Sequence, residues 1–282
     1  MEHKRSIDDD RSRIKGMRAG LKPYTLDQIN NEIARKVLEN LRQRGKPASG
    51  ATRNRYLALL RSIIRKAHRE WEWLDNAPAF TLYKEAKRRI RWLNPGEAQR
   101  LLKELPDHWK PIVAFALATG LRKNNILKLR WNQIDMTRRV AWVHPDEAKA
   151  DHGIGVPLNQ TAINAIRGCM GQHSEFVFTY KGEPMRIDSN SAWRSALVRA
   201  GITNFRFHDL RHTWASWHVQ NGTGLAELQE MGGWESAEMV RRYAHLAPDH
   251  MHSHASKLDS LLGTTDDTFT AQNEKGLMRE SA

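Results

Sequence analysis

The chain of 282 residues has a single cysteine and no long uninterrupted apolar run. One cysteine, Cys169, excludes an internal disulfide framework and fits a reducing compartment. Residues 1–20 are charged throughout, so the apolar stretch of a secretory signal is missing. No segment shows the run of apolar residues that a transmembrane helix needs. We therefore expect a cytoplasmic protein.

Acidic residues are also scarce relative to basic ones. The chain has 45 Lys and Arg against 32 Asp and Glu, a net charge of +13, and a pI near 10.0. Such a surplus favours a nucleic acid partner, because each cation that neutralises a phosphate releases condensed counterions. An acidic membrane surface would attract the same charge, but no amphipathic helix with an aromatic face is present to dock on it.

The composition is that of a globular protein, with 40% hydrophobic and 27% charged residues. Because 282 residues exceed what one core usually organises, we expect two domains. Residues 1–22 are polar and basic and predict a flexible arm, residues 23–88 a helical domain, residues 89–250 a second domain, and residues 251–282 a polar tail. The second domain begins clearly, since Asn94, Pro95 and Glu97 form an N-cap, a first-turn proline and an acid at the third position.

Hydrophobic periodicity predicts the elements within these segments. In the first domain, Thr25 and Gln28 form a capping-box pattern ahead of apolar residues at 29, 33, 37 and 41, and a second helix runs over 52–73. In the second domain the pattern predicts helices over 109–118, 126–129 and 159–169, strands around 134, 140–143, 154–156 and 175–179, and mainly helices from 188 onward. The fold class is mainly α with a small antiparallel β-sheet (α+β).

Two basic clusters are candidate DNA contacts. Arg61, Arg65 and Arg69 recur at helical spacing on one side of the second helix, where a solvated face and a phosphate-binding face both fit. The mostly cationic segment 84–91 does not suit a core and predicts an interdomain linker. Its candidate DNA-binding residues are Lys87, Arg88 and Arg89.

The second domain also contains the residue types that phosphodiester cleavage needs without a metal. Two arginines, Arg122 and Arg211, suit the phosphate oxygens, because a guanidinium is planar and permanently charged. Lys149, in an expected hairpin turn, suits protonation of the leaving oxygen. The hydroxyl of Tyr243 suits attack on phosphorus and storage of the bond as an ester. Individually, each residue also fits a surface or packing role.

Together these residues resemble a known motif set. Residues 92–250 are similar to the catalytic domain of the tyrosine recombinase (phage integrase) family, whose motif order is Arg, Lys, His-x-x-Arg, His or Trp, then Tyr. That order falls on Arg122, Lys149, His208 with Arg211, Trp234 and Tyr243, with the family's usual nine-residue spacing between the last two. Phrases such as Ala118-Thr119-Gly120-Leu121-Arg122 and His208-Asp209-Leu210-Arg211-His212 are characteristic.

The resemblance implies a site-specific DNA recombinase or integrase that cleaves and rejoins double-stranded DNA through a 3′-phosphotyrosyl intermediate, with no metal, ATP or other cofactor. It implies a homotetramer on DNA and allows for an accessory DNA-bending protein. Residues 24–90 resemble, more weakly, the helical core-binding domain. With only about twenty residues ahead of it, the arm-binding domain of many phage integrases is expected to be missing or reduced.

Two positions depart from the family pattern. Trp234 stands where most members have a histidine, although its indole N–H is still a donor for a phosphate oxygen. Asn125 stands where many members have an acid that supports the first arginine, and it supplies no charge. We place Asn125 and His212 among the supporting residues of the site.

Three other functions fit parts of the pattern. His208 and His212 imitate a zinc-binding His-Glu-x-x-His motif, and three histidines at 250, 252 and 254 form a second cluster. A non-catalytic DNA-binding regulator would explain the charge and the helices, and a type IB topoisomerase shares the chemistry.

In the tail, regularly spaced leucines predict that residues 250–265 form a short helix that packs on a neighbouring subunit.

Overall fold

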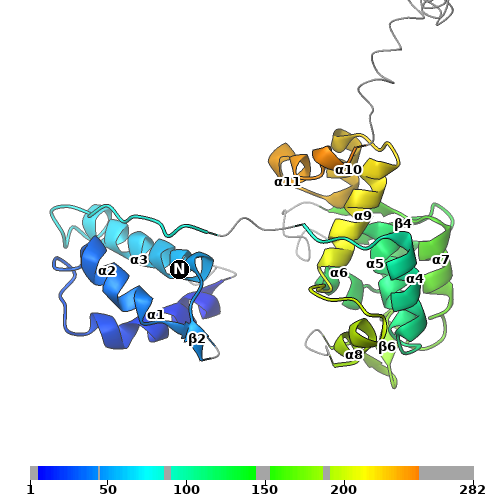
Figure 1. Cartoon of the computed structure of the whole chain (residues 1–282), viewed down its shortest axis with the longest axis horizontal. Coiled ribbons are helices and arrows are strands. Elements are labelled where there is room, and N and C mark those ends of the chain that lie inside the picture. Colours follow the sequence, from blue (N-terminus) through cyan, green and yellow to red (C-terminus); the bar gives the residue numbers. More distant parts are fainter. Residues whose placement is uncertain (1–5, 44, 86–89, 144–152, 187–190, 248–282) are drawn as a thin grey trace, which may run out of the picture. The chain divides into compact units, whose positions relative to one another are not determined.

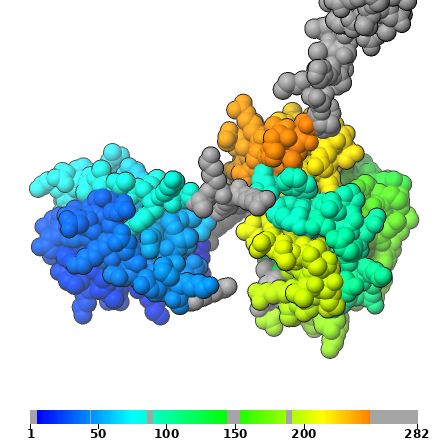
Figure 2. Space-filling view, in the orientation of Figure 1, coloured from blue at the N-terminus to red at the C-terminus, as the bar shows by residue number. Residues whose placement is uncertain are grey.

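A computed structural model describes residues 6–43, 45–85, 90–143, 153–186 and 191–247. The chain divides into two compact units, Met1–Arg89 and Ile90–Ala282. Figure 1 shows the elements of each unit, and the space-filling view shows that each is closely packed (Figure 2). Lys87, Arg88, Arg89, Lys149 and the tail from 251 lie outside the described residues. No helix in the described ranges has the length and apolar character needed to cross a membrane.

The N-terminal unit is a small helical domain. Its elements are α1 (Ile7–Leu21), α2 (Asn31–Glu39), a hairpin of β1 (Arg42–Gln43) and β2 (Lys46–Pro47), and α3 (Gly50–Arg69). The three helices bury one apolar cluster, of which Leu38, Leu57 and Ile64 are fully buried members. Asn54 on α3 binds the backbone N–H and carbonyl of Tyr83, so the segment after α3 returns along this helix.

The prediction of a flexible arm over residues 1–22 is wrong, because residues 7–21 form α1. Asp8, Asp9 and Asp10 lie in the first turn of this helix, where carboxylates favour the positive end of the helix dipole. Arg13 pairs with two of these carboxylates. Met17 is the decisive residue, since its side chain is buried against α2 and α3. Only one of the apolar residues of this mostly charged segment is fully buried, and such a pattern is too weak to predict the helix from periodicity.

The start of α2 was also predicted too early. The backbone N–H of Thr25 donates to the side chain of Gln28, but this contact closes a turn rather than a helix. The helix begins at Asn31, with the Asn30 side chain accepting from the N–H of Ile33. Asparagine is a stronger N-cap than threonine, and Asn30 directly precedes the first helical residue, so the helix begins there and not at Thr25.

The expected second helix is α3, which is capped by Ser49 and ends four residues before Trp73. Its buried side includes Leu57, Leu60, Ile64 and Ala67. Trp71 and Trp73, beyond the end of the helix, are exposed and in mutual ring contact.

The C-terminal unit is mainly helical with small antiparallel sheets, as predicted. It comprises α4 (Pro95–Glu104), α5 (Lys110–Thr119), α6 (Lys123–Leu127), η1 (Trp131–Gln133), β3 (Ile134–Asp135), β4 (Val140–Val143), β5 (Ile154–Pro157), α7 (Gln160–Arg167), β6 (Thr179–Tyr180), β7 (Glu183–Pro184), α8 (Ser191–Arg199), α9 (Asp209–Gln220), α10 (Leu225–Gly232), α11 (Ala237–Arg241) and η2 (Ala244–Leu246). The strands β3, β4 and β5 form one antiparallel sheet in that order, with Ala141 opposite Val156.

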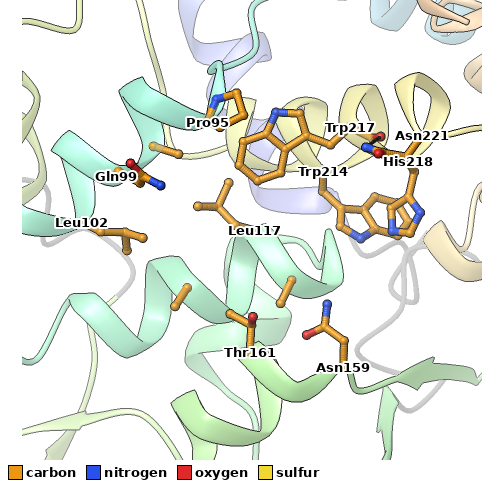
Figure 3. Close-up of a pocket in the computed structure, with 13 residues that line it drawn as sticks. Pro95, Gln99, Leu102, Leu117, Asn159, Thr161, Trp214, Trp217, His218 and Asn221 are labelled. Carbon is orange, nitrogen blue, oxygen red and sulfur yellow. Dashed lines mark hydrogen bonds between the residues drawn. The ribbon is translucent and has the colours of Figure 1, made fainter. Parts of the chain in front are cut away.

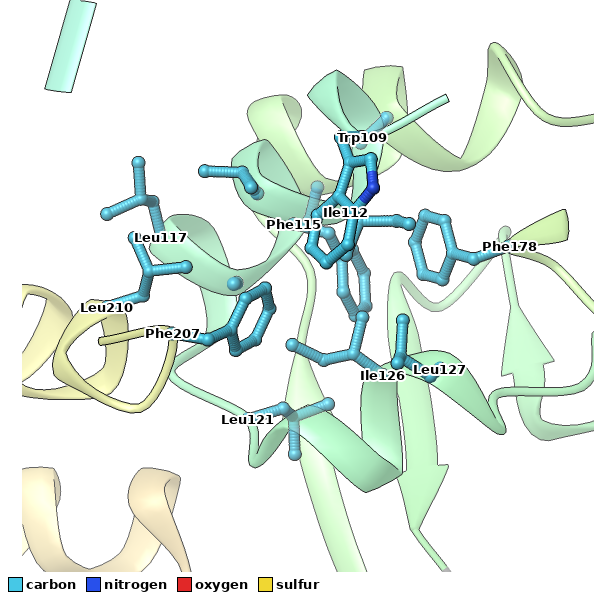
Figure 4. Close-up of a cluster of buried hydrophobic side chains, with 14 of the residues drawn as sticks. Trp109, Ile112, Phe115, Leu117, Leu121, Ile126, Leu127, Phe178, Phe207 and Leu210 are labelled. Carbon is cyan, nitrogen blue, oxygen red and sulfur yellow. The ribbon is translucent and has the colours of Figure 1, made fainter. Parts of the chain in front are cut away.

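Helix α5 lies at the centre of the C-terminal unit, packed against α7 and α9. Because α5 is apolar on nearly every side, it can be buried all round. Its Ile112 and Phe115 are fully buried, and Figure 4 shows them among aromatic and aliphatic side chains from α6, α9 and the segment at Phe178. The capping box predicted at Asn94 and Glu97 is present and begins α4.

Two elements of this unit differ from prediction. The strand expected over 175–179 is only the two-residue strand β6, which pairs with β7. Phe176 forms an isolated bridge to Arg130 instead. The helix expected over 126–129 begins earlier, at Lys123, and ends at Leu127.

We predict that Met17→Ala destabilises the N-terminal unit. Removing a fully enclosed methionine costs about 2 kcal/mol or more, because the cavity is only partly refilled. Ile14→Ala, on the same helix but exposed, is the matched control and should cost about 0.5 kcal/mol or less. Native-state hydrogen exchange of the α2 and α3 amides measures both changes. Equal protection of these amides in the two variants would mean that the packing of Met17 does not stabilise the N-terminal unit.

Candidate active site

Arg211 is the most deeply placed charge of the site. It lies in the first turn of α9 and is 4% exposed. Its Nη1 donates to the carbonyl of Gly120 at 2.7 Å and its Nη2 to the carbonyl of Gly232 at 2.6 Å. These carbonyls lie at the C-terminal ends of α5 and α10, where unpaired oxygens and the helix dipole favour a cation. Burial, and then the charge of Arg122, lower the pKa of Arg211 to about 9, so it stays charged at neutral pH.

Arg122 follows the turn that ends α5. Gly120 has φ of +64°, which terminates α5 in the left-handed conformation, and Arg122 then occupies the N-cap position of α6. The side chain is half-buried, and burial lowers its pKa while the charge of Glu235 opposes the shift. Its charge acts on both Arg211 and His208, so the two predicted arginines face one region.

Tyr243 lies between α11 and η2 and is 1% exposed. Its hydroxyl oxygen is 2.5 Å from Nδ1 of His212. Burial raises the pKa of Tyr243 to about 12, although the positive charges of Arg211 and Arg242 partly oppose the rise. The phenol is therefore protonated at neutral pH, and the charge of Arg211 is close enough to affect its pKa.

The two histidines of the site have different surroundings. His208 precedes α9, is solvent-exposed on one side, and contacts the His212 ring edge to face at 5.3 Å between centroids. Desolvation and then the charge of Arg211 lower the pKa of His208. His212 lies deeper, and burial, followed by the charge of His208, lowers its pKa to about 4. Both imidazoles are thus neutral at pH 7 in the free protein.

Trp234 packs under the buried guanidinium. The Cζ atom of Arg211 is 4.0 Å from the centre of the Trp234 ring, in a cation–π contact. On its other sides the ring contacts Trp214 and Tyr243, each at 6.0 Å between centroids. This tryptophan therefore connects the arginine to the tyrosine through its ring. The predicted hydrogen bond from its indole N–H to a phosphate remains a prediction.

Asn125 is buried at 6% exposure, and within the described residues its Nδ2 has no hydrogen-bond partner. Support of Arg122 would use the amide oxygen of Asn125, because a guanidinium only donates, and it stays a prediction. Lys149 lies outside the described residues, in the connection between the paired strands β4 and β5. On α3, Arg65 and Arg69 are exposed and Arg61 is half-buried.

An apolar cavity of about 480 Å³ lies behind the site, among α4, α5, α9 and the start of α7 (Figure 3). Trp214 is common to the cavity and the site, because it lines the cavity and also contacts Trp234. The side chains around the cavity are mostly uncharged, as in the labelled residues Gln99, Leu117 and Trp217. The residues that line the cavity do not include Arg122, Arg211 or Tyr243.

Metal ligands are not gathered in the part of the chain that the structure describes, where no group of three or more His, Cys, Asp or Glu side chains is close enough to hold an ion. The two histidines of the zinc-like pattern contact each other through their rings, and Nδ1 of His212 is bonded to the tyrosine hydroxyl. Of the other candidate cluster, all three histidines lie outside the described residues.

Sequence reasoning missed the groups that hold Arg211, because they are backbone carbonyls. The sequence feature that marks these carbonyls is a glycine at each position. In the structure, a Cβ at Gly120 would lie 2.3 Å from the Trp214 ring, and one at Gly232 would lie 2.0 Å from the Trp234 ring. These glycines let two tryptophans approach the backbone beside the guanidinium. Arg242, whose charge acts on Tyr243 and His212, was likewise not singled out.

Comparison with known proteins shows the family of the chain. The model of the phage integrase family matches residues 91–250. The integrase of Salmonella phage P22 is 46% identical over 93% of this chain and 78% of that protein. A shufflon-specific DNA recombinase of Escherichia coli is 33% identical over 77% of this chain and 56% of that protein.

Solved structures share the fold at low identity. A Tn1549 transposon integrase in complex with a circular intermediate DNA has a TM-score of 0.72 at 16% identity, covering 90% of this chain and 94% of that one. A lambda integrase dimer bound to a COC′ core site has a TM-score of 0.67 at 19% identity, covering 84% and 90%.

The chain belongs to the phage integrase family. It is a site-specific recombinase, an enzyme that catalyses DNA cleavage and rejoining. The relatives decide against the non-catalytic regulator and the topoisomerase, and the predicted family and enzyme class are confirmed.

We predict that Gly120→Ala disrupts the Arg211 anchor. The change combines a left-handed backbone with a Cβ in the Trp214 ring, and should cost about 2 to 4 kcal/mol of stability. Gly171→Ala is the matched control: φ is +78° there, but a Cβ would meet nothing within 4 Å. It should cost only about 1 kcal/mol. Thermal melting measures both, and equal losses would show that the contact with Trp214 is unimportant.

Proposed function

We propose that Tyr243 is the nucleophile of this recombinase and that Arg122 and Arg211 hold the scissile phosphate. One observation carries the proposal: the guanidinium of Arg211, the ring of Trp234 and the ring of Tyr243 lie in consecutive contact, although they come from three separate segments. The charge of Arg122 acts on the same place. A phosphate bound there meets two cations beside a hydroxyl.

Arg211 retains donors for such a phosphate. A guanidinium carries five N–H groups, and two of them are used by the carbonyls of Gly120 and Gly232. The carbonyls fix the plane of the fork, so the remaining donors are oriented before DNA arrives. In the transition state the nonbridging oxygens gain charge, and preoriented arginines stabilise that charge without a reorganisation cost.

The reaction forms a bond between the Tyr243 oxygen and phosphorus and releases the 5′ oxygen of the DNA, leaving a 3′-phosphotyrosyl ester. We assign protonation of the leaving oxygen to Lys149, with His208 donating to a phosphate oxygen from the exposed side of the site. Trp234 donates through its indole N–H. Because Arg122, Arg211 and Lys149 supply the positive charge in this proposal, no metal, ATP or other cofactor is required.

Binding to double-stranded DNA involves both units in this proposal. The N-terminal unit serves as a core-type DNA-binding domain, with Arg61, Arg65 and Arg69 on α3 as phosphate contacts and Lys87, Arg88 and Arg89 as contacts from the linker. The net charge of +13 supports this assignment. The reducing compartment expected for a single cysteine places the enzyme in the cytoplasm.

A homotetramer is the proposed active form. Recombination of two duplexes needs four strand cuts, and each protomer supplies one Tyr243. The expected docking of residues 250–265 on a neighbouring subunit belongs to this proposal, and an accessory DNA-bending protein would help to bring the duplexes together. Sedimentation of a cleavage-deficient variant on paired duplexes would count the protomers.

Tyr243→Phe tests the nucleophile, because it removes only the hydroxyl. With a nicked suicide substrate in EDTA, the wild-type enzyme should accumulate a covalent adduct, while Tyr243→Phe binds the duplex and forms none. Denaturing gels measure the adduct, and band shifts measure binding. An adduct at the wild-type level in the variant would contradict the assignment, and a wild-type enzyme inactive in EDTA but restored by a divalent ion would contradict metal independence.

Arg122→Lys and Arg211→Lys test the phosphate clamp. Lysine keeps the charge but loses the bidentate fork, so single-turnover cleavage should fall about 100-fold or more, as on loss of one oxyanion-hole donor. DNA affinity should change much less, since many basic residues remain. Arg167→Lys, at the exposed end of α7 in the same unit, is the matched control and should cleave at nearly the wild-type rate. Affinity falling as far as rate would identify Arg122 and Arg211 as ordinary backbone contacts.

A further inference from the structure

We propose that His212 is the general base of the cleavage step and accepts the proton of the Tyr243 hydroxyl through Nδ1. The inference rests on the proposed role of Tyr243 as nucleophile and adds the residue that activates it. Of the two histidines at the start of α9, only His212 contacts that hydroxyl, with the oxygen 2.5 Å from Nδ1. His208 contacts the other ring instead and is exposed.

The contact is held from both sides. His212 directly follows Arg211 on α9, and the carbonyl anchors of Arg211 fix that turn of the helix. Tyr243 is held by the bond from its backbone N–H to the carbonyl of Val240, and η2 packs on α9. The two rings lie 5.9 Å apart between centroids, inclined at 46°. These contacts on both sides place the oxygen next to the nitrogen.

The chemistry requires a base at this position. The tyrosine is protonated at neutral pH, so its oxygen must lose a proton as it bonds to phosphorus. A neutral imidazole can accept that proton. Burial lowers the pKa of His212 to about 4, which keeps the ring neutral but also makes it a weaker base in the free protein. The ionisable groups that act on His212 besides the tyrosine are His208, Asp209, Arg206 and Arg242. A bound phosphate adds a negative charge nearby, which stabilises the imidazolium as it forms.

The step balances without another reagent. The tyrosine O–H bond breaks, its proton moves to Nδ1 of His212, the O–P bond forms, and the bond from phosphorus to the 5′ oxygen breaks. The 5′ oxygen takes its proton from Lys149 in the proposed function. In rejoining, a 5′ hydroxyl attacks, and the departing tyrosine oxygen recovers its proton from His212. One residue therefore serves as the base for cleavage and the acid for rejoining.

His212→Asn is the principal test, because asparagine places an oxygen acceptor near the position of Nδ1 without its basicity. Single-turnover cleavage should fall about 100-fold or more, within the range of general base catalysis. His218→Asn is the matched control. His218 lies on the same helix, is half-buried, and its Nδ1 bonds to the Thr223 hydroxyl at 3.0 Å, away from Tyr243. It should cleave within about threefold of the wild-type rate.

A substrate with sulfur in place of the bridging 5′ oxygen locates the defect, because a thiolate leaves without a proton. It should restore cleavage by Lys149→Ala but not by His212→Asn. His212→Ala provides a second route if the asparagine variant fails to fold: added imidazole should raise its cleavage rate at least tenfold and leave His218→Ala unaffected. Band shifts on a half-site check that each variant binds DNA.

The outcomes separate this inference from the proposed function. An adduct formed by Tyr243→Phe would remove the nucleophile itself. If that variant is inert while His212→Asn cleaves at the wild-type rate or faster, His212 only holds the tyrosine at rest, and the inference fails alone. Rescue of His212→Asn by the sulfur substrate would place the histidine at the leaving group and equally overturn it.

Discussion

The burial of one guanidinium sets the architecture of the catalytic unit. A charge as enclosed as Arg211 is tolerated only where oxygens replace its water, and here the ends of α5 and α10 provide them. Two helices that are distant in sequence must therefore stop at the same point beside α9. The glycines at these ends, the tryptophans that pack over them and the entry to α6 at Arg122 all follow from that requirement.

Burial of the site also keeps Tyr243 and His212 uncharged in the free enzyme. Desolvation keeps the Tyr243 hydroxyl protonated and the His212 ring neutral, so the free protein contains a nucleophile with its proton acceptor but no anion to attack others. The positive charge of Arg211 is already in place, balanced by dipoles rather than by a carboxylate. A DNA phosphate is then the missing negative charge, and its arrival changes the electrostatics of every group in the cluster.

Local sequence patterns predicted the structural features that depend on neighbouring residues. The cap at Asn94 and the strands of the sheet β3–β4–β5 were predictable, because caps, turns and periodicity depend on residues a few positions apart. The candidate residues Arg122, Trp234 and Tyr243 are far apart in the sequence and were found through the family resemblance. Helix α1 was missed because one buried side chain, Met17, stabilises it through contacts with distant helices. The partners of Arg211 were missed because every residue has a carbonyl, and only the folded chain shows which ones converge.

That last property bears on how such a site endures sequence change. A carboxylate counterion disappears with one substitution, whereas a main-chain oxygen is present whatever residue occupies the position. Drift in the side chains of α5 and α10 leaves the cradle of Arg211 intact as long as both helices end where they do. The vulnerable positions are then the few that set those endings, such as Gly120 and Gly232, and they carry no functional group at all.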